Sequence, residues 1–438
     1  MKRSVSAVLG LATAMTLVLA GCGNGSDSGS PGAGVPTGPV TLTLAGWSLS
    51  TTPEFKTLAD GFHAANPNVT VELKEYDATN YDTQMIADLS AHSAPDIYVQ
   101  KNLKNFYTYQ SGGQLLDVSD VAKDLGDKVG GLADYKLDNK TYAIPYRQDS
   151  WVLFYNKALF DKAGVAYPDG SWTWDKYVSV SKQLTTALKG AGSKALGDYE
   201  HIWQSTVQGF ALAQTPGASL QSGNFSYLKP YYGWVQDLQN SGAQPTFGTA
   251  TTNKLTYQAE FGKQQAAMML MGTWYIATLL SQQAKGDADT FTWGMAPAPQ
   301  FDSSTAGSGK TPVSFGDPTG LGINPAISKD KISAAKAFLA YAAGQQGAKA
   351  LAAIGITPAD TAAVATDFFA TKGMPTDDLS KFAFSTHNTK PENPVSKYTA
   401  GLQNILNDLH TGVMSGSKNV DSAITDAQNR AKNEVLNS

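Results

Sequence analysis

Residues 40–73 alternate between strand-like and helix-like hydrophobic patterns, and this alternation restricts the chain to a small group of folds. Residues 40–44 alternate apolar and polar side chains, as a half-buried strand does. Residues 55–62 repeat apolar side chains at helical spacing until Pro67, and residues 69–73 then alternate again. A strand, a helix and a second strand in this order predict parallel strands joined by a right-handed crossover.

The same two patterns continue along the chain. They predict strands at 97–99, 151–155 and 266–271 and helices at 81–91, 157–163, 174–188, 335–342 and within 396–435. A chain of 438 residues is longer than one hydrophobic core usually serves. The sequence therefore predicts an α/β protein with two lobes.

A lone cysteine marks the beginning of the mature chain. Lys2 and Arg3 precede an uncharged stretch from Val5 to Ala20, and Leu19-Ala20-Gly21-Cys22 closes it. This is the pattern of a secretory signal over residues 1–21, followed by a cysteine that takes a diacylglyceryl group. Because Cys22 is the only cysteine, the fold has no disulfide framework and rests on packing.

The composition after the signal favours a folded domain held near a membrane by a tether. Residues 22–39 are mostly Gly, Ser and Pro, which cannot bury enough apolar surface to fold. No later stretch has the roughly 18 apolar residues that a membrane span needs. Loss of Lys2 and Arg3 leaves 31 basic against 37 acidic side chains, a net charge of about -6, which disfavours nucleic-acid binding.

The segment from Ile144 to Lys157, Ile-Pro-Tyr-Arg-Gln-Asp-Ser-Trp-Val-Leu-Phe-Tyr-Asn-Lys, resembles the lobe-crossing strand of extracellular solute-binding proteins of family 1, the maltose-binding-like class. Further motifs of that family follow in order along nearly the whole mature chain. They are Trp47, Asn66-Pro67, Ala94-Pro95-Asp96, Phe160-Asp161-Lys162-Ala163-Gly164, Trp172-Thr173-Trp174-Asp175, Gly272-Thr273-Trp274, Ala296-Pro297-Ala298-Pro299 and Gly355-Ile356-Thr357-Pro358-Ala359.

The resemblance implies a hinged, two-lobe periplasmic-binding-protein-like fold of type II with a ligand cleft between the lobes. We expect residues 40–148 with 316–360 to form the first lobe, and residues 149–315 with 361–438 the second. It also implies binding without catalysis or a cofactor, by a monomer lipid-anchored at the extracellular face of the cell membrane. The bound solute passes to the membrane subunits of an ABC permease.

The resemblance and the strand ends together indicate candidate solute contacts. Asp149 stands where sugar-binding relatives often carry a carboxylate that accepts hydroxyl hydrogen bonds. Arg147 can donate a bidentate pair of hydrogen bonds. Trp274 matches the position of an aromatic platform in the family. The remaining candidates are Trp47, Gln100 and Asn102 at strand ends, Trp151 and Trp203 as second platforms, and Asp317 in the return crossing.

Several alternatives stay open at this point. Aromatic residues and Asp149 favour a neutral mono- or oligosaccharide, whereas Arg147 with Lys101 or Lys104 favours an anionic solute such as a glycerol phosphodiester or a uronate. A lipid-anchored glycoside hydrolase needs two carboxyls about 5 to 10 Å apart across a cleft, and an adhesin needs no solute at all. Tyr231-Tyr232 resembles the tyrosine pair of ferric-ion binders, although its surroundings fit a helix face and we expect no metal.

Overall fold

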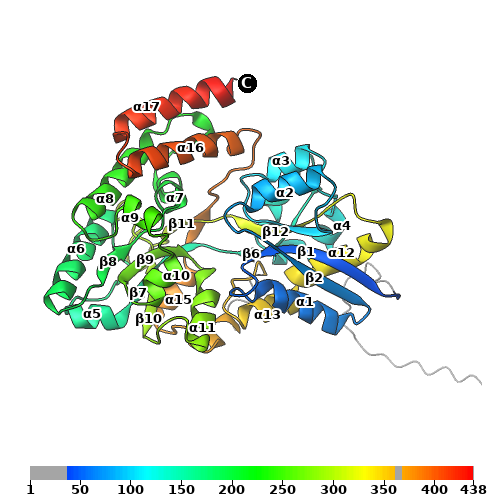
Figure 1. Cartoon of the computed structure of the whole chain (residues 1–438), viewed down its shortest axis with the longest axis horizontal. Helices are drawn as coiled ribbons and strands as arrows, with labels where there is room; N and C mark the ends of the chain where they lie inside the picture. The colour runs from blue at the N-terminus through cyan, green and yellow to red at the C-terminus, as the bar shows by residue number, and fades with distance from the viewer. Residues whose placement is uncertain (1–36, 361–366, 438) are drawn as a thin grey trace, which may run out of the picture. The chain divides into compact units, whose positions relative to one another are not determined.

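The computed structural model describes residues 37–360 and 367–437. Within them the chain forms two mixed sheets, each flanked by helices and each with its own hydrophobic core (Figure 1). The predicted signal peptide and Cys22 lie outside the described residues. The predicted α/β fold with two lobes is therefore confirmed.

The first sheet has five strands. Its order is β2 (Val69–Tyr76), β1 (Val40–Trp47), β3 (Ile97–Gln100), β12 (Pro318–Ile323) and β6 (Ile144–Gln148). β1 runs parallel to β2 and β3, and β12 runs antiparallel to β3 and β6. The parallel pairing of β1 with β2 across a helix is the arrangement that residues 40–73 predict.

The second sheet has four strands. Its order is β10 (Trp293–Pro297), β7 (Trp151–Asn156), β9 (Ala266–Gly272) and β8 (Leu196–Tyr199). β7 is antiparallel to both of its neighbours, and β8 is parallel to β9. β7 and β9 are buried along their whole length, which explains why their sequences are continuously apolar.

Helices cover both sheets. The helices of the first lobe are α1 (Glu54–Ala65), α2 (Tyr81–Ser90), α3 (Phe106–Ser111), α4 (Ser119–Leu125), α12 (Lys329–Ala343) and α13 (Gln345–Ala352). Those of the second are α5 (Lys157–Ala163), α6 (Trp174–Gly190), α7 (Ser205–Gln214), α8 (Lys229–Asn240), α9 (Phe247–Thr252), α10 (Tyr257–Gly262), α11 (Tyr275–Lys285), α15 (Asp378–Ser385), α16 (Thr399–Met414) and α17 (Val420–Arg430). The predicted helices and strands are confirmed, with shifts of a few residues at their ends.

The two cores draw on different parts of the chain. Apart from Ala277, the buried apolar residues of the first core come from residues 42–146 and 321–359. Those of the second come from 151–315 and 352–431. These ranges agree closely with the expected lobes, whose boundaries stay a prediction. Among the described residues, no helix combines the length and apolar character that a bilayer crossing requires.

The segments that join the lobes run beside one another. β6 leads through Asp149 into β7, and β11 (Val313–Phe315) leads through Gly316 into β12, while β11 pairs with β13 (Asn388–Lys390). A Cβ on Gly316 would lie 2.2 Å from the carbonyl oxygen of Asp149, so this close approach requires glycine. The course of the chain here agrees with a return crossing near residue 316.

Candidate functional site

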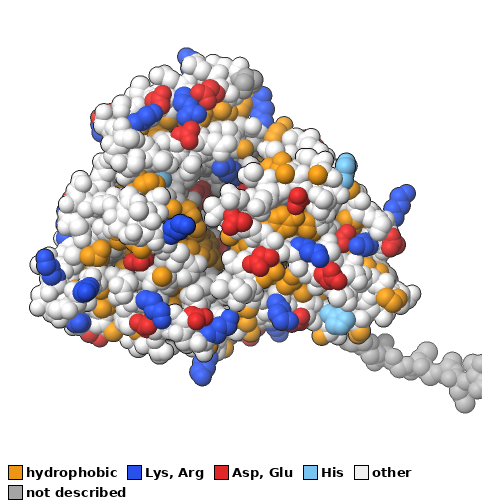
Figure 2. Space-filling model, viewed as in Figure 1, with side chains coloured by type: hydrophobic (Ala, Val, Ile, Leu, Met, Phe, Trp, Pro, Cys, Tyr) orange, Lys and Arg blue, Asp and Glu red, His pale blue; other side chains and the backbone are white. Residues whose placement is uncertain are grey.

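One edge of the second sheet gathers residues from three strands. β8 and β9 are parallel and end at Tyr199 and Gly272, while β7 runs the opposite way and begins at Trp151, opposite Gly272. Residues 149–151, 200–203 and 273–274 therefore lie at the same edge. Figure 2 shows the surface hollowed between the two lobes, with hydrophobic side chains on its wall.

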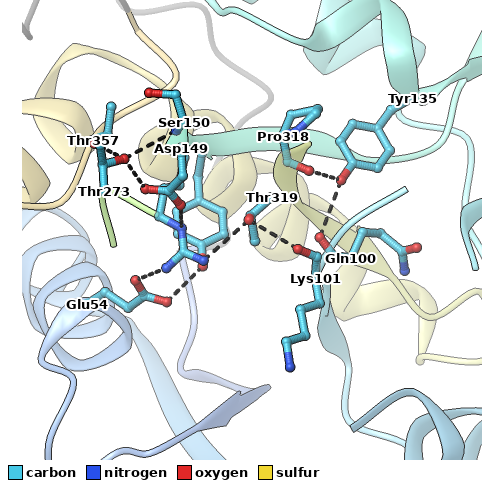
Figure 3. Close-up of polar contacts among 12 residues, drawn as sticks. Glu54, Gln100, Lys101, Tyr135, Asp149, Ser150, Thr273, Pro318, Thr319 and Thr357 are labelled. Atoms are coloured by element: carbon cyan, nitrogen blue, oxygen red, sulfur yellow. Dashed lines mark hydrogen bonds and ion pairs between the residues drawn. The ribbon is translucent and has the colours of Figure 1, made fainter. Parts of the chain in front are cut away.

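Arg147 lies at the centre of a buried ion-pair network. Its Nη1 is 2.5 Å from Oε2 of Glu54 in α1, and its Nη2 donates to Oγ1 of Thr319 at 3.3 Å. Nε lies 2.8 Å from Oδ2 of Asp149, although its N–H is not directed at that oxygen. Arg147 is 7% exposed and Glu54 is fully buried, so Arg147 is already paired with two carboxyls (Figure 3).

The electrostatics of this network follow from its burial. Burial alone would lower the pKa of Arg147, but the negative charges of Glu54 and Asp149 outweigh it and raise that pKa. Burial raises the pKa of Asp149 above its ordinary value, and Arg147 and Thr273 only partly oppose this. Arg147 is therefore a permanent cation whose charge is matched inside the protein.

Asp149 connects the crossing segment to the second lobe. The hydroxyl of Thr273 donates to Oδ1 of Asp149 at 2.9 Å, and the hydroxyl of Thr357 donates to Thr273 at 3.1 Å (Figure 3). The backbone N–H of Thr273 also donates to the carbonyl of Ser150. Asp149 is 4% exposed. Its contacts therefore position the crossing and leave little carboxyl surface for a solute.

Trp274 rests on a glycine at this edge. A Cβ on Gly272 would lie 1.8 Å from the indole of Trp274, so the absence of a side chain there makes room for the ring. Trp274 is partly exposed and meets Trp151 edge to face at 5.4 Å. Its indole is also close enough to the hydroxyl of Tyr257 in α10 to lower the pKa of that hydroxyl. Trp151 itself is 3% exposed and stacks on Phe315 at 5.0 Å, so it belongs to the core.

Trp203 is the most exposed tryptophan among the predicted contacts. It is 39% exposed and lies between the end of β8 and α7. His201 meets its ring edge to face at 4.4 Å, and Tyr257 at 5.5 Å. Burial raises the pKa of Tyr257 to about 12, and Arg147 also acts on this hydroxyl. Trp203 and Trp274 both adjoin Tyr257, and we call these three residues the aromatic wall.

The strand ends of the first lobe bring Trp47 and Lys101 together. Trp47 is 9% exposed and packs edge to face on Phe55 and Tyr81. The ammonium of Lys101 lies 5.4 Å from its ring and donates to the carbonyl of Ala78 at 2.6 Å. Burial lowers the pKa of Lys101.

Gln100, Asn102 and Asp317 have local roles in the structure. Gln100 is 1% exposed, and its amide atoms have no partner. Asn102 accepts a bond from the backbone of Lys104. Asp317 accepts four hydrogen bonds, from the backbone N–H groups of Leu103, Glu392 and Asn393 and from the side chain of Asn393. Solute contact by any of these three stays a prediction, and only Gln100, whose buried amide has no partner, has side-chain polar atoms left without a bond inside the protein.

The structure adds residues that the sequence reasoning missed. Glu54 and Thr273 complete the network around Arg147 and Asp149, and Tyr257 completes the aromatic wall. A fully buried acid at the start of a helix gives no local signal of its partner. Thr273, in contrast, lies inside the Gly-Thr-Trp motif that identified Trp274.

Metal ligation has little support in the described part of the chain. No group of three or more His, Cys, Asp or Glu side chains is placed there to hold a metal ion. Tyr231 and Tyr232 are 1% and 0% exposed on α8, as a helix face predicts. Their hydroxyls bond to Gln214 and Gln208, respectively.

Comparisons with known proteins agree on the kind of protein this is. A family model described as bacterial extracellular solute-binding protein matches residues 57–376. A multiple sugar-binding protein of Streptococcus mutans is 21% identical over 391 residues, 86% of each chain. A binding protein of Brucella abortus is 24% identical over 284 residues, which are 60% of this chain and 63% of that protein. A sugar transporter of Rhizobium etli, solved in an open conformation, is 29% identical with a TM-score of 0.72, covering 90% of this chain and 99% of that one.

Proposed function

The chain belongs to the bacterial extracellular solute-binding proteins, and we propose on this basis that it captures a neutral mono- or oligosaccharide for an ABC importer. We choose a neutral sugar because the aromatic wall lies near Arg147, whose positive charge is already balanced by Glu54 and Asp149. The similarity to a multiple sugar-binding protein of Streptococcus mutans and to a sugar transporter of Rhizobium etli supports the same choice.

The aromatic wall suits a sugar because a pyranose presents a flat C–H face. An aromatic side chain buries about 150 to 250 Å² when fully covered, which at about 25 cal/mol per Å² is several kcal/mol of gross apolar gain. Trp203 and Trp274 are both partly exposed at one sheet edge. We propose these two, with Tyr257, as the stacking residues. Trp47 is a further candidate on the first lobe.

The charges around Arg147 favour a neutral solute. An anion at Arg147 would have to compete with Glu54 and Asp149, which are both buried beside it. The anionic alternative has one supporting feature, because Lys101 and Lys104 follow β3 at the corresponding edge of the first sheet. Lys101, however, is already held by a backbone carbonyl and the Trp47 ring.

Delivery to a membrane permease and a lipid anchor at Cys22 complete the proposal. Solute that contacts both lobes favours the closed form, so a permease can distinguish loaded from empty protein by shape. Cys22 and the Gly/Ser/Pro tether would hold the mature protein, as a monomer, at the extracellular face of the cell membrane.

Catalysis and adhesion are the other classes of function. A hydrolase would require two accessible carboxyls that face each other across the cleft. Two buried carboxyls close to the lobe crossing, Glu54 and Asp149, are instead bonded to Arg147 and Thr273. A search for hydrolysis products after incubation with each bound saccharide tests the enzyme, and the absence of any solute would favour the adhesin.

Isothermal calorimetry tests the proposal directly. Protein that begins after Cys22 is unfolded and refolded to remove carried-over solute, then titrated with neutral saccharides and with anionic analogues. We expect one neutral saccharide to bind with one-to-one stoichiometry and a micromolar Kd, about -8 kcal/mol. Binding by anions alone would overturn the choice of solute.

A matched pair of variants locates the site. Trp274→Ala should weaken binding at least about tenfold, or about 1.4 kcal/mol. Phe301→Ala removes a 37%-exposed aromatic ring of the second lobe that contacts Tyr231 and Trp234 instead, so its affinity should equal that of the wild type. Equal affinity in both variants would remove Trp274 from the site.

A further inference from the structure

Two carboxyl groups lie behind the aromatic wall on one side of the second sheet. Asp198 is in β8 and Glu200 directly follows it, so the alternation of an extended chain places both side chains on the same face. Tyr199 and His201 point the other way, where His201 meets Trp203. Asp198 is 1% exposed, and Glu200 is partly buried.

The groups that face this acid pair come from four segments and are all uncharged. Tyr177 in α6 donates its hydroxyl to Oδ1 of Asp198. The hydroxyl of Thr206 lies 2.8 Å from Oε1 of Glu200, and the Gln244 side chain is close enough to oppose the rise in the pKa of Glu200. The hydroxyl of Tyr232 in α8 also lies within electrostatic range of Glu200, bonded to Gln208 and to His410.

No cation balances the pair in the part of the chain that the structure describes. Neither acid forms an ion pair with lysine, arginine or histidine there, and the nearby His410 has its pKa lowered by burial to about 4, so it is neutral. Two ionised carboxyls buried together would repel each other strongly, because the low local dielectric strengthens their interaction.

Two oxygens near the pair also have no donor. Oδ2 of Asp198 and Oε1 of Gln244, whose side chain is 3% exposed, are buried without a hydrogen-bond partner. An orphaned buried acceptor costs about 1 to 3 kcal/mol. A proton on one carboxyl would turn an acceptor into a donor and remove one negative charge at the same time.

The pKa values agree with this reading. Burial raises the pKa of Asp198 to about 7. Burial, together with the charge of Asp198, raises that of Glu200 to about 8. The acids therefore titrate near neutral pH, well above their usual range.

We propose that Asp198 and Glu200 together keep at least one proton while the protein binds its solute, and that this proton positions the loop of residues 200–206 that carries Trp203. The link is Thr206, whose Oγ1 lies 2.8 Å from Oε1 of Glu200 and 2.7 Å from the carbonyl oxygen of Trp203. Because a hydroxyl has one hydrogen, both contacts are hydrogen bonds only when a protonated Glu200 donates to Thr206 and Thr206 donates to Trp203. Glu200 is a positioning residue in this account. Its effect on affinity rests on the proposed function, in which Trp203 stacks on the solute.

Ionisation of both acids should loosen this link. The pair then carries two negative charges without a cation, and movement of Glu200 toward water relieves the repulsion but releases Thr206. The loop follows, and Trp203 leaves its position. Solute affinity is thus expected to fall as the pH rises through the pKa values of the pair.

Calorimetry across the pH range tests the proposal with three variants. Wild-type affinity should fall at least about tenfold between about pH 6 and pH 9. Glu200→Gln keeps the shape and the neutral charge, so it should bind like the wild type at about pH 6 and lose less than about twofold at pH 9. Asp198→Asn, which removes the repulsion, should flatten the profile in the same way.

Asp421→Asn is the matched control, because Asp421 is an exposed acid of the same lobe, paired with Lys229. It should follow the wild type at every pH. A wild-type profile that is flat, or a Glu200→Gln profile that falls as steeply as the wild type, would overturn the proposal.

A solute-free measurement separates this inference from the proposed function. The infrared C=O band of a protonated carboxyl should be present in the wild type near neutral pH and reduced in Glu200→Gln or Asp198→Asn. If no saccharide binds, the proposed function is wrong, but the infrared band still shows whether one of the two carboxyls is protonated. If the band is absent, or if Ca²⁺ restores affinity at high pH and a chelator abolishes it at neutral pH, a proton does not satisfy the pair.

Discussion

Replacement of Gly272 by alanine should disable the aromatic wall without any change to an aromatic residue. A Cβ at this position would lie 1.8 Å and 2.2 Å from ring atoms of Trp274. Carbon atoms in contact prefer about 3.5 to 4.0 Å, so the indole must move by roughly 2 Å. Gly272 does not have a positive φ, so an alanine there does not strain the backbone. The effect of the substitution therefore comes from displacement of the Trp274 indole.

The size of the effect follows from the area of the indole. Full burial of an aromatic side chain is worth about 4 to 6 kcal/mol at 25 cal/mol per Å². Trp274 is already partly buried by its own protein, so a solute can cover only part of that area. We expect Gly272→Ala to weaken saccharide binding by about 2 kcal/mol, or about 30-fold. The free energy of unfolding should fall by about 1 to 3 kcal/mol from overpacking.

A double-mutant cycle gives the assay. Calorimetry compares Gly272→Ala, Trp274→Ala and the double variant, while urea unfolding checks that each one folds. Since both single changes remove the same stacked ring, the double variant should bind no more weakly than Trp274→Ala. Unchanged affinity in Gly272→Ala, or losses that add in the double variant, would refute the placement of Trp274 at the solute.

Three further predictions concern stability. Arg147→Met leaves Glu54 without its cation and should lower the free energy of unfolding in urea by about 3 to 5 kcal/mol, whereas Arg430→Met, at a partly exposed arginine, should cost less than about 1 kcal/mol. Asp317→Asn replaces an acceptor of four donors and should cost about 1 to 3 kcal/mol; an unchanged melting temperature would contradict this. Because the folded-state pKa of Asp198 is raised to about 7, its stabilising contribution is complete below about pH 4 and is lost as the pH rises toward 7. Asp198→Asn should therefore show a flatter decline of stability over that range in thermal unfolding.

Most of the fold could be predicted from the sequence, because its apolar residues recur at the regular spacings of strands and helices. Residues 40–44 and 69–73 alternate cleanly, and they form β1 and β2 with the expected parallel register. The uninterrupted apolar run at 266–271 became a fully buried strand. In each case the signal lies within a few neighbouring residues, which is the distance over which secondary structure is decided.

The candidate site was only partly predictable, because its contacts join residues that are far apart in the sequence. Trp274 was a candidate because it lies in the Gly272-Thr273-Trp274 motif of the family, whereas Trp203 follows β8, a strand that the hydrophobic pattern did not predict. The pairing of Arg147 with Glu54 spans 93 positions of sequence, and no local pattern encodes it. Strand ends also do not reveal which way a side chain turns. Gln100 ends β3 yet is 1% exposed, with its amide inside the protein.

If a neutral saccharide closes the two lobes, the distance between them must shorten when it binds. Residues 23–438 contain no cysteine, so Ser111→Cys in the first lobe and Asn253→Cys in the second, both exposed, give unique sites for a pair of spin labels. Double electron–electron resonance then measures their separation. We expect a shorter distance with the bound neutral saccharide and no change with anionic analogues. The same distance with and without a saccharide that calorimetry shows to bind would contradict capture by closure.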